Sequence, residues 1–143
     1  MKRLWDDFYL LDAGSPTVNW IMMCGWWEGL NGLTYKENVE DTRKSPARDL
    51  IKELKEYNID VFGYDPYLSK TQIESFDVKP LNNLEDLDFD VDSFVFTVSH
   101  DEFKGISIGE LKDLSNTNPL LVDVRGIFSK EESEETEFIY KKL

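Results

Sequence analysis

Cysteine and histidine are nearly absent from this 143-residue sequence, which contains one of each, Cys24 and His100. A single cysteine cannot form an internal disulfide, so we expect an intracellular protein and, by default, the cytoplasm. The carboxylates show no metal-ligand spacing, and neither Cys24 nor His100 has a second residue of its type, so we predict no metal site. No apolar run reaches the roughly 20 residues of a membrane-spanning helix. The pair Asp6-Asp7 near the start argues against a targeting segment.

Basic residues are also scarce, with 16 Lys and Arg against 29 Asp and Glu, for a formal net charge of −13. This charge repels nucleic acids and anionic membranes, so we expect neither as a partner. The hydrophobic content of 41% and the nine phenylalanines argue against disorder. The length fits about one domain with an ordinary core.

From residue 32 onward, strand patterns alternate with helix patterns, which predicts an α/β fold with a mostly parallel sheet. Ser93–Ser99 has apolar residues on both faces, as in a central strand covered by helices on each side. The Asp65-Pro66 dipeptide predicts a turn at the carboxyl end of its strand. The predicted strands are Ile59–Tyr64, Phe76–Val78, Ser93–Ser99 and Leu120–Val124, which we take as the last.

Helix signals lie between these strands. Ser45 and Pro46 form a good N-cap and first position, and an apolar stripe follows to Tyr57 before Asn58 ends the helix. Ser107 and Glu110 have capping-box spacing ahead of a helix that stops before Pro119. Residues 82–92 are acidic and predict a short helix followed by a loop.

The most specific stretch is Gly32–Leu50, GLTYKENVEDTRKSPARDL. It brings Lys36 and Arg43 into a loop just before a helix N-terminus, where cations and free N–H groups favour a phosphorylated ligand. The alternative is a solvated loop with a good helix cap.

This block, followed by ARDLIKELKEYN, VFGYDPY, FVFTVSHDEFK and LLVDVRGIF, resembles the C-terminal domain of the UDP-glucose/GDP-mannose dehydrogenase family over Gly32–Phe128. The resemblance implies a Rossmann-like three-layer domain with about five strands flanked by helices. It also implies UDP-sugar as the ligand. The Thr-Tyr-Lys-Glu-Asn form of the signature looks more like dehydrogenases of N-acetylated hexosamines, such as UDP-N-acetylmannosamine, than those of UDP-glucose.

The resemblance also implies roles for individual residues. Lys36 matches a lysine that contacts the UDP-sugar, and Tyr35 could flank the nucleotide, although buried packing is an equal alternative. Arg125 matches the arginine after the last strand that helps bind the nucleotide. Many relatives have Asn next, where this sequence has Gly126. Arg43 matches an arginine near the NAD cofactor.

The complete enzymes of this family oxidise the sugar C6 hydroxyl to a carboxylate with NAD and a catalytic cysteine. This sequence contains neither GxGxxG nor the GGxCxPKD context of that cysteine, and Cys24 is read as a packed thiol. We therefore assign no catalytic residue and predict that the chain alone is inactive. Its expected partners are a UDP-sugar and an N-terminal dehydrogenase half or further copies of itself. The alternative is a non-catalytic nucleotide-sugar-binding or assembly module.

Both ends differ from the middle of the chain. Residues 1–31 hold all four tryptophans and form an atypical segment, which either supplies a strand such as Asn19–Cys24 or is an unusual extension. Residues 129–143 are acidic, and the spacing of Ser129 and Glu132 favours a surface helix over an acidic binding tail. The pair His100-Asp101 permits an acid–base interpretation, but without a nucleophile we interpret it as a structural turn.

Overall fold

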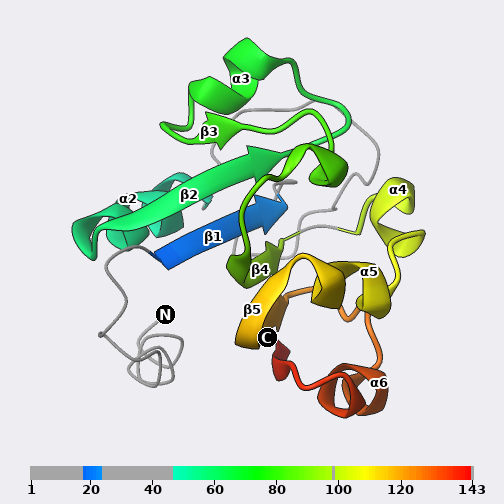
Figure 1. Ribbon diagram of the computed structural model, residues 1–143. Coiled ribbons are helices and arrows are strands. Elements are labelled where there is room, and N and C mark those ends of the chain that lie inside the picture. Colours follow the sequence, from blue (N-terminus) through cyan, green and yellow to red (C-terminus); the bar gives the residue numbers. More distant parts are fainter. Residues whose placement is uncertain (1–17, 24–46, 98, 143) are drawn as a thin grey trace, which may run out of the picture.

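The computed structural model describes residues 18–23, 47–97 and 99–142. These residues form a six-stranded sheet in the order β3-β2-β1-β4-β5-β6, and every neighbouring pair is parallel (Figure 1). The mostly parallel α/β sheet predicted from the sequence is therefore confirmed. The strands are β1 (Val18–Met23), β2 (Ile59–Tyr64), β3 (Lys79–Pro80), β4 (Val91–Phe96), β5 (Ser115–Asp123) and β6 (Ile139–Lys142).

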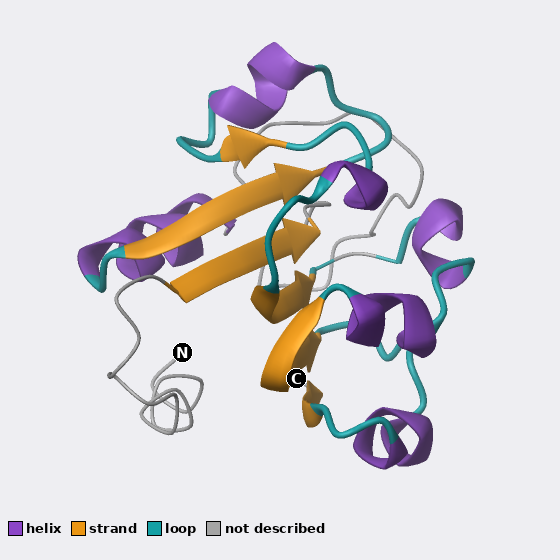
Figure 2. Ribbon diagram, in the orientation of Figure 1, coloured by secondary structure: helices purple, strands orange, loops and turns teal. Residues whose placement is uncertain are grey.

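Helices lie on both sides of the strands (Figure 2). The α-helices are α2 (Ala47–Glu56), α3 (Lys70–Glu74), α4 (Asp101–Lys104), α5 (Ile108–Asp113) and α6 (Lys130–Glu135), and η2 (Leu84–Asp86) is a 3-10 helix. Parallel strands are usually joined by helices, because the chain must return to the same end of the sheet before each new strand begins.

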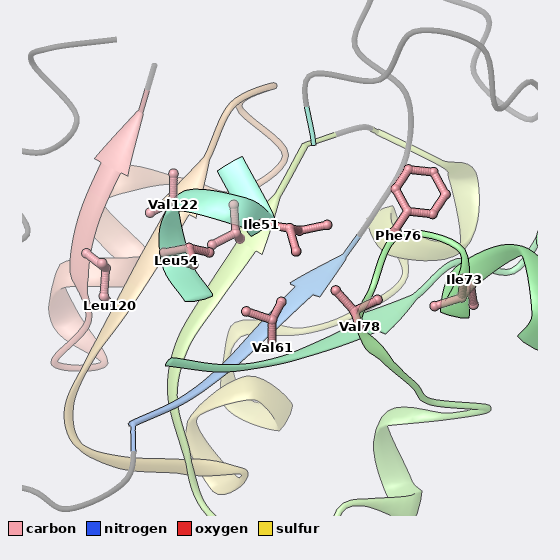
Figure 3. Packing of buried hydrophobic residues seen from close by; sticks show 9 residues of the cluster. Ile51, Leu54, Val61, Ile73, Phe76, Val78, Leu120 and Val122 are labelled. Atoms are coloured by element: carbon pink, nitrogen blue, oxygen red, sulfur yellow. The ribbon is translucent and has the colours of Figure 1, made fainter. Parts of the chain in front are cut away.

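Two buried clusters fill the spaces between the sheet and its helices. Val95 belongs to the first cluster, while its neighbours Phe94 and Phe96 belong to the second, so β4 is buried on both faces. The first cluster, shown in Figure 3, contains Ile51, Leu54, Val61, Ile73, Phe76, Val78, Val95, Leu120 and Val122. The second contains Val91, Phe94, Phe96, Phe103, Ile108, Leu111, Leu121 and Phe138.

Gly63 lets α3 and β3 pack directly on β2. A Cβ at this position would lie 2.8 Å from methyl carbons of both Ile73 and Val78. Such distances are below ordinary van der Waals contact, so any side chain here would push these elements apart.

Several local predictions are confirmed. β2 has the predicted bounds, and Asn58 ends the preceding helix with φ of 57°, in the left-handed region that Asn tolerates. Ser107 and Glu110 form the capping box of α5, with both reciprocal hydrogen bonds present. Ser45 and Pro46 lie outside the described residues. The acidic stretch forms η2 followed by a loop, as predicted, except that its last two residues already belong to β4.

Other predictions need correction. The short strand expected at Phe76–Val78 is wrong, because β3 is formed by Lys79–Pro80 instead. Helix α3 was not predicted, although Ser69 and Gln72 form a full capping box. The predicted strand Leu120–Val124 overlaps β5, which begins earlier at Ser115 and ends at Asp123. It is not the last strand, because β6 pairs with it.

The two ends of the chain both contribute to the sheet. The sequence left open whether residues 1–31 supply a strand or form an extension. The structure shows a strand, because β1 lies between β2 and β4 in the middle of the sheet. At the other end, Ser129 caps α6 by accepting the Glu132 N–H, and β6 follows at the sheet edge. Across the described ranges, no helix has the length and apolarity needed to cross a membrane.

Candidate functional site

Buried polar side chains gather where the strands end. Asp65 follows β2, Thr97 and His100 follow β4, and Asp123 ends β5, with exposed fractions of 6% or less. All the strands are parallel, so these carboxyl ends lie along one edge of the sheet. Open parallel sheets bind ligands at this edge.

Asp123 organises the loop that follows β5. Its Oδ1 accepts the N–H of Gly126 at 2.8 Å and that of Arg125 at 3.2 Å. Its Oδ2 accepts the N–H of Phe128 at 2.9 Å and the hydroxyl of Tyr140 at 3.0 Å. A carboxylate with no exposure to solvent is thus bonded to four donors, three of them in one loop.

Arg125 is therefore presented by a loop of fixed shape. The backbone reverses at Gly126, whose φ of +71° is in the region that favours glycine. The Arg125 side chain is half-buried, and its Nη2 is shielded from solvent. The planar fork of a guanidinium suits phosphate oxygens, and the fixed loop backbone sets where this side chain starts.

Tyr140 gives this network a measurable pH dependence. Burial, together with the Asp123 carboxylate, raises the pKa of Tyr140 from 10.0 to about 12. The folded state favours the neutral phenol, so its stabilisation is complete below about pH 10 and is lost as the pH rises through about 12. We expect wild type to lose more unfolding free energy between these values than Tyr140→Phe, as measured by urea unfolding. Equal losses in both proteins would contradict this.

The structure pairs His100 with a different carboxylate from the one adjacent in sequence. His100 Nε2 lies 3.5 Å from Asp65 Oδ2, and both side chains are buried. Asp101 is exposed and forms an ion pair with Lys104 at 2.9 Å. The His100 carbonyl oxygen accepts the N–H groups of Phe103 and Lys104, so this residue begins the α4 turn.

Tyr67 covers the His100–Asp65 pair. Its ring centroid is 4.8 Å from that of His100, and its N–H donates to Asp65 Oδ1 at 2.8 Å. Its hydroxyl donates to Glu102 at 3.0 Å, and the pKa of Tyr67 is raised by desolvation and by this bond. The contacts join the turn after β2 to α4.

Of the residues singled out from the sequence, Arg125 lies at this edge, whereas Tyr35, Lys36 and Arg43 lie outside the described residues. Sequence reasoning assigned no role to Asp123, although it lies in the quoted LLVDVRGIF segment, and it missed Tyr140. The available signal was an aspartate at the end of an apolar strand, immediately before a loop. Within the described ranges, no group of three or more His, Cys, Asp or Glu could hold a metal ion.

Comparison with known proteins identifies a family for this chain. The model of the UDP-glucose/GDP-mannose dehydrogenase family, UDP binding domain, matches residues 29–130. A UDP-N-acetyl-D-mannosamine dehydrogenase of Methanococcus aeolicus is 32% identical over 85% of this chain and 27% of its own length. A UDP-glucose 6-dehydrogenase of Rhizobium meliloti is 32% identical over 78% of this chain and 26% of its own length.

The fold has a counterpart among solved structures. The crystal structure of an NDP-N-acetyl-D-galactosaminuronic acid dehydrogenase from Methanosarcina mazei matches with a TM-score of 0.71 and 21% identity. The match covers 88% of this chain and 24% of that one, so the chain spans about a quarter of the length of these relatives. The chain belongs to the UDP-glucose/GDP-mannose dehydrogenase family, and its matched region is the family's UDP binding domain.

Proposed function

We propose that this chain binds the UDP-sugar substrate of an NAD-dependent nucleotide-sugar 6-dehydrogenase. The observation that carries the proposal is the Arg125 loop, which Asp123 fixes at the carboxyl edge of the sheet within the matched region. The guanidinium would bind the diphosphate or the adjoining nucleotide through charge-assisted hydrogen bonds. The same edge is where parallel sheets place their ligands.

Residues outside the described ranges enter the proposal through their sequence positions. Lys36 would contact the UDP-sugar and Tyr35 would flank the nucleotide. Arg43 would face NAD, which the complete enzyme would hold mainly through its N-terminal half. In the complete enzyme, two NAD molecules would each accept one hydride, because oxidation of the sugar C6 hydroxyl to a carboxylate removes four electrons and takes up one water. This chain supplies binding and orientation, with residues 32–128 as the proposed ligand-binding unit.

An N-acetylated hexosamine is the sugar we favour. The relatives from Methanococcus aeolicus and Methanococcus vannielii are both named UDP-N-acetyl-D-mannosamine dehydrogenase, and the second is 38% identical over 68% of this chain. The Thr-Tyr-Lys-Glu-Asn signature independently favours the same class.

Arg125→Ala should weaken UDP binding by about tenfold to a hundredfold, the range for losing one charge-assisted hydrogen-bonding partner. Arg125→Lys should recover part of the affinity, because it restores the charge without the planar fork. Isothermal titration calorimetry with UDP would measure both effects.

Lys55→Ala is the matched control for Arg125→Ala. Lys55 lies in the last turn of α2, which leads into the amino end of β2, and pairs with Asp77. The substitution removes one positive charge near the amino ends of the strands, whereas Arg125 lies near their carboxyl ends. Equal UDP affinity in Arg125→Ala and Lys55→Ala would contradict the proposed role of Arg125.

A further inference from the structure

Strand β6 brings a second cation to the Arg125 loop. The parallel register places Lys142 beside Asp123 and Tyr140 beside Leu121. Side chains alternate along a strand, so Tyr140 and Lys142 lie on one face and Lys141 on the other. The Tyr140 hydroxyl reaches Asp123, which shows that this face points toward the loop.

Lys142 lies directly against Gly126. A Cβ at Gly126 would be 2.9 Å from the Lys142 Nζ and 3.0 Å from its Cε. The ammonium group therefore lies in space that a side chain at residue 126 would share. The ammonium thus lies beside the residue that follows Arg125.

The Lys142 ammonium is exposed and lies apart from the carboxylates of the described ranges. It forms no ion pair with any of them. Five other lysines each lie within 4.0 Å of a carboxylate: Lys55, Lys79, Lys104, Lys112 and Lys130. Within the described ranges Lys52 and Lys70 also have no ion pair, and Lys142 differs from these two by lying against the Arg125 loop. In a chain with a net charge of −13, a cation without an acidic partner creates a local site for an anion.

We propose that Lys142 is a second phosphate-binding cation, so that β5 and β6 together form the diphosphate site. The inference rests on the proposed function and adds to it a residue beyond Arg125. Tyr140 positions the site through Asp123, and Lys142 supplies a compact charge that suits one phosphate oxygen. A diphosphate carries more than one negative charge, so two cations match it better than one.

Calorimetry with UDP tests this inference on the full chain. Lys142→Met keeps the aliphatic stem over Gly126 and removes only the charge, and it should weaken UDP binding about tenfold. Lys142→Arg should retain most of the affinity. Lys141→Met, on the opposite face of the same strand, is the matched control and should change affinity by less than about twofold.

Thermal unfolding distinguishes ligand binding from a structural role. When no ligand is present, Lys142→Met should unfold at the same temperature as the wild-type chain, whereas Lys141→Met serves as the control for UDP affinity alone. Equal UDP affinity in these two variants would overturn the inference, while a remaining deficit in Arg125→Ala would leave the proposed function standing. Failure of the wild-type chain to bind UDP would contradict the proposed function and this inference together.

Discussion

Asp123→Ala should lower the free energy of unfolding by about 3–5 kcal/mol, as expected when a buried charged partner is removed from its hydrogen bonds. The side chain has no exposure to solvent and accepts the N–H groups of Arg125, Gly126 and Phe128 and the hydroxyl of Tyr140. Alanine leaves the three backbone N–H groups without their acceptor, while the Tyr140 hydroxyl keeps its hydrogen bond to the Phe128 carbonyl oxygen.

Urea unfolding at neutral pH would measure the loss at Asp123. Asp123→Asn should cost less, because one oxygen still accepts hydrogen bonds. Asp113→Ala removes an exposed carboxylate from α5 and should change stability by no more than about 0.5 kcal/mol. If Asp123→Ala were as mild as Asp113→Ala, the Asp123 network would not hold the loop as described.

Phe96→Ala should also cost about 3–5 kcal/mol, the usual range for deleting a fully buried phenylalanine. The Phe96 ring is edge-on to Phe103 at 5.8 Å and to Phe128 at 4.8 Å, measured between ring centroids. Phe128 lies in the loop that carries Arg125, so Phe96 packs against this loop through the Phe128 ring. Its removal creates a cavity between the sheet and the loop.

Urea unfolding of three variants would separate cavity formation from general loss of an aromatic ring. Phe96→Leu fills part of the volume and should cost clearly less than Phe96→Ala. Tyr57→Ala removes a ring that is 61% exposed and should have a small effect. A similar cost for Phe96→Ala and Tyr57→Ala would show that Phe96 is not a core residue.

Local signals predicted much of the fold. The Ser107 capping box and the Asn58 helix end are set by side chains within a few positions of each other, so the sequence displays them directly. β6 was missed because Ile139–Lys142 is short and half basic, and only its partner β5 makes it a strand. Its position depends on a long-range pairing that no local pattern contains.

The site was predicted less completely for the same reason. Arg125 was identified through its motif, but its fixed position depends on Asp123 and on Tyr140, which comes from another strand. Likewise, the sequence suggests Asp101 as the partner of His100, whereas the fold brings Asp65 from the end of β2. Contacts between strand ends follow from sheet order, which periodicity does not determine.

The central position of β1 has a consequence for folding kinetics. Its backbone register aligns Trp20 with Val61 on one side and Ser93 on the other, so both neighbours follow much later in the chain. Closing such long loops costs chain entropy before the strand pairing can stabilise the sheet. Parallel sheets of this kind therefore fold slowly. During synthesis on the ribosome, β1 must therefore wait for β4 before the middle of the sheet can close.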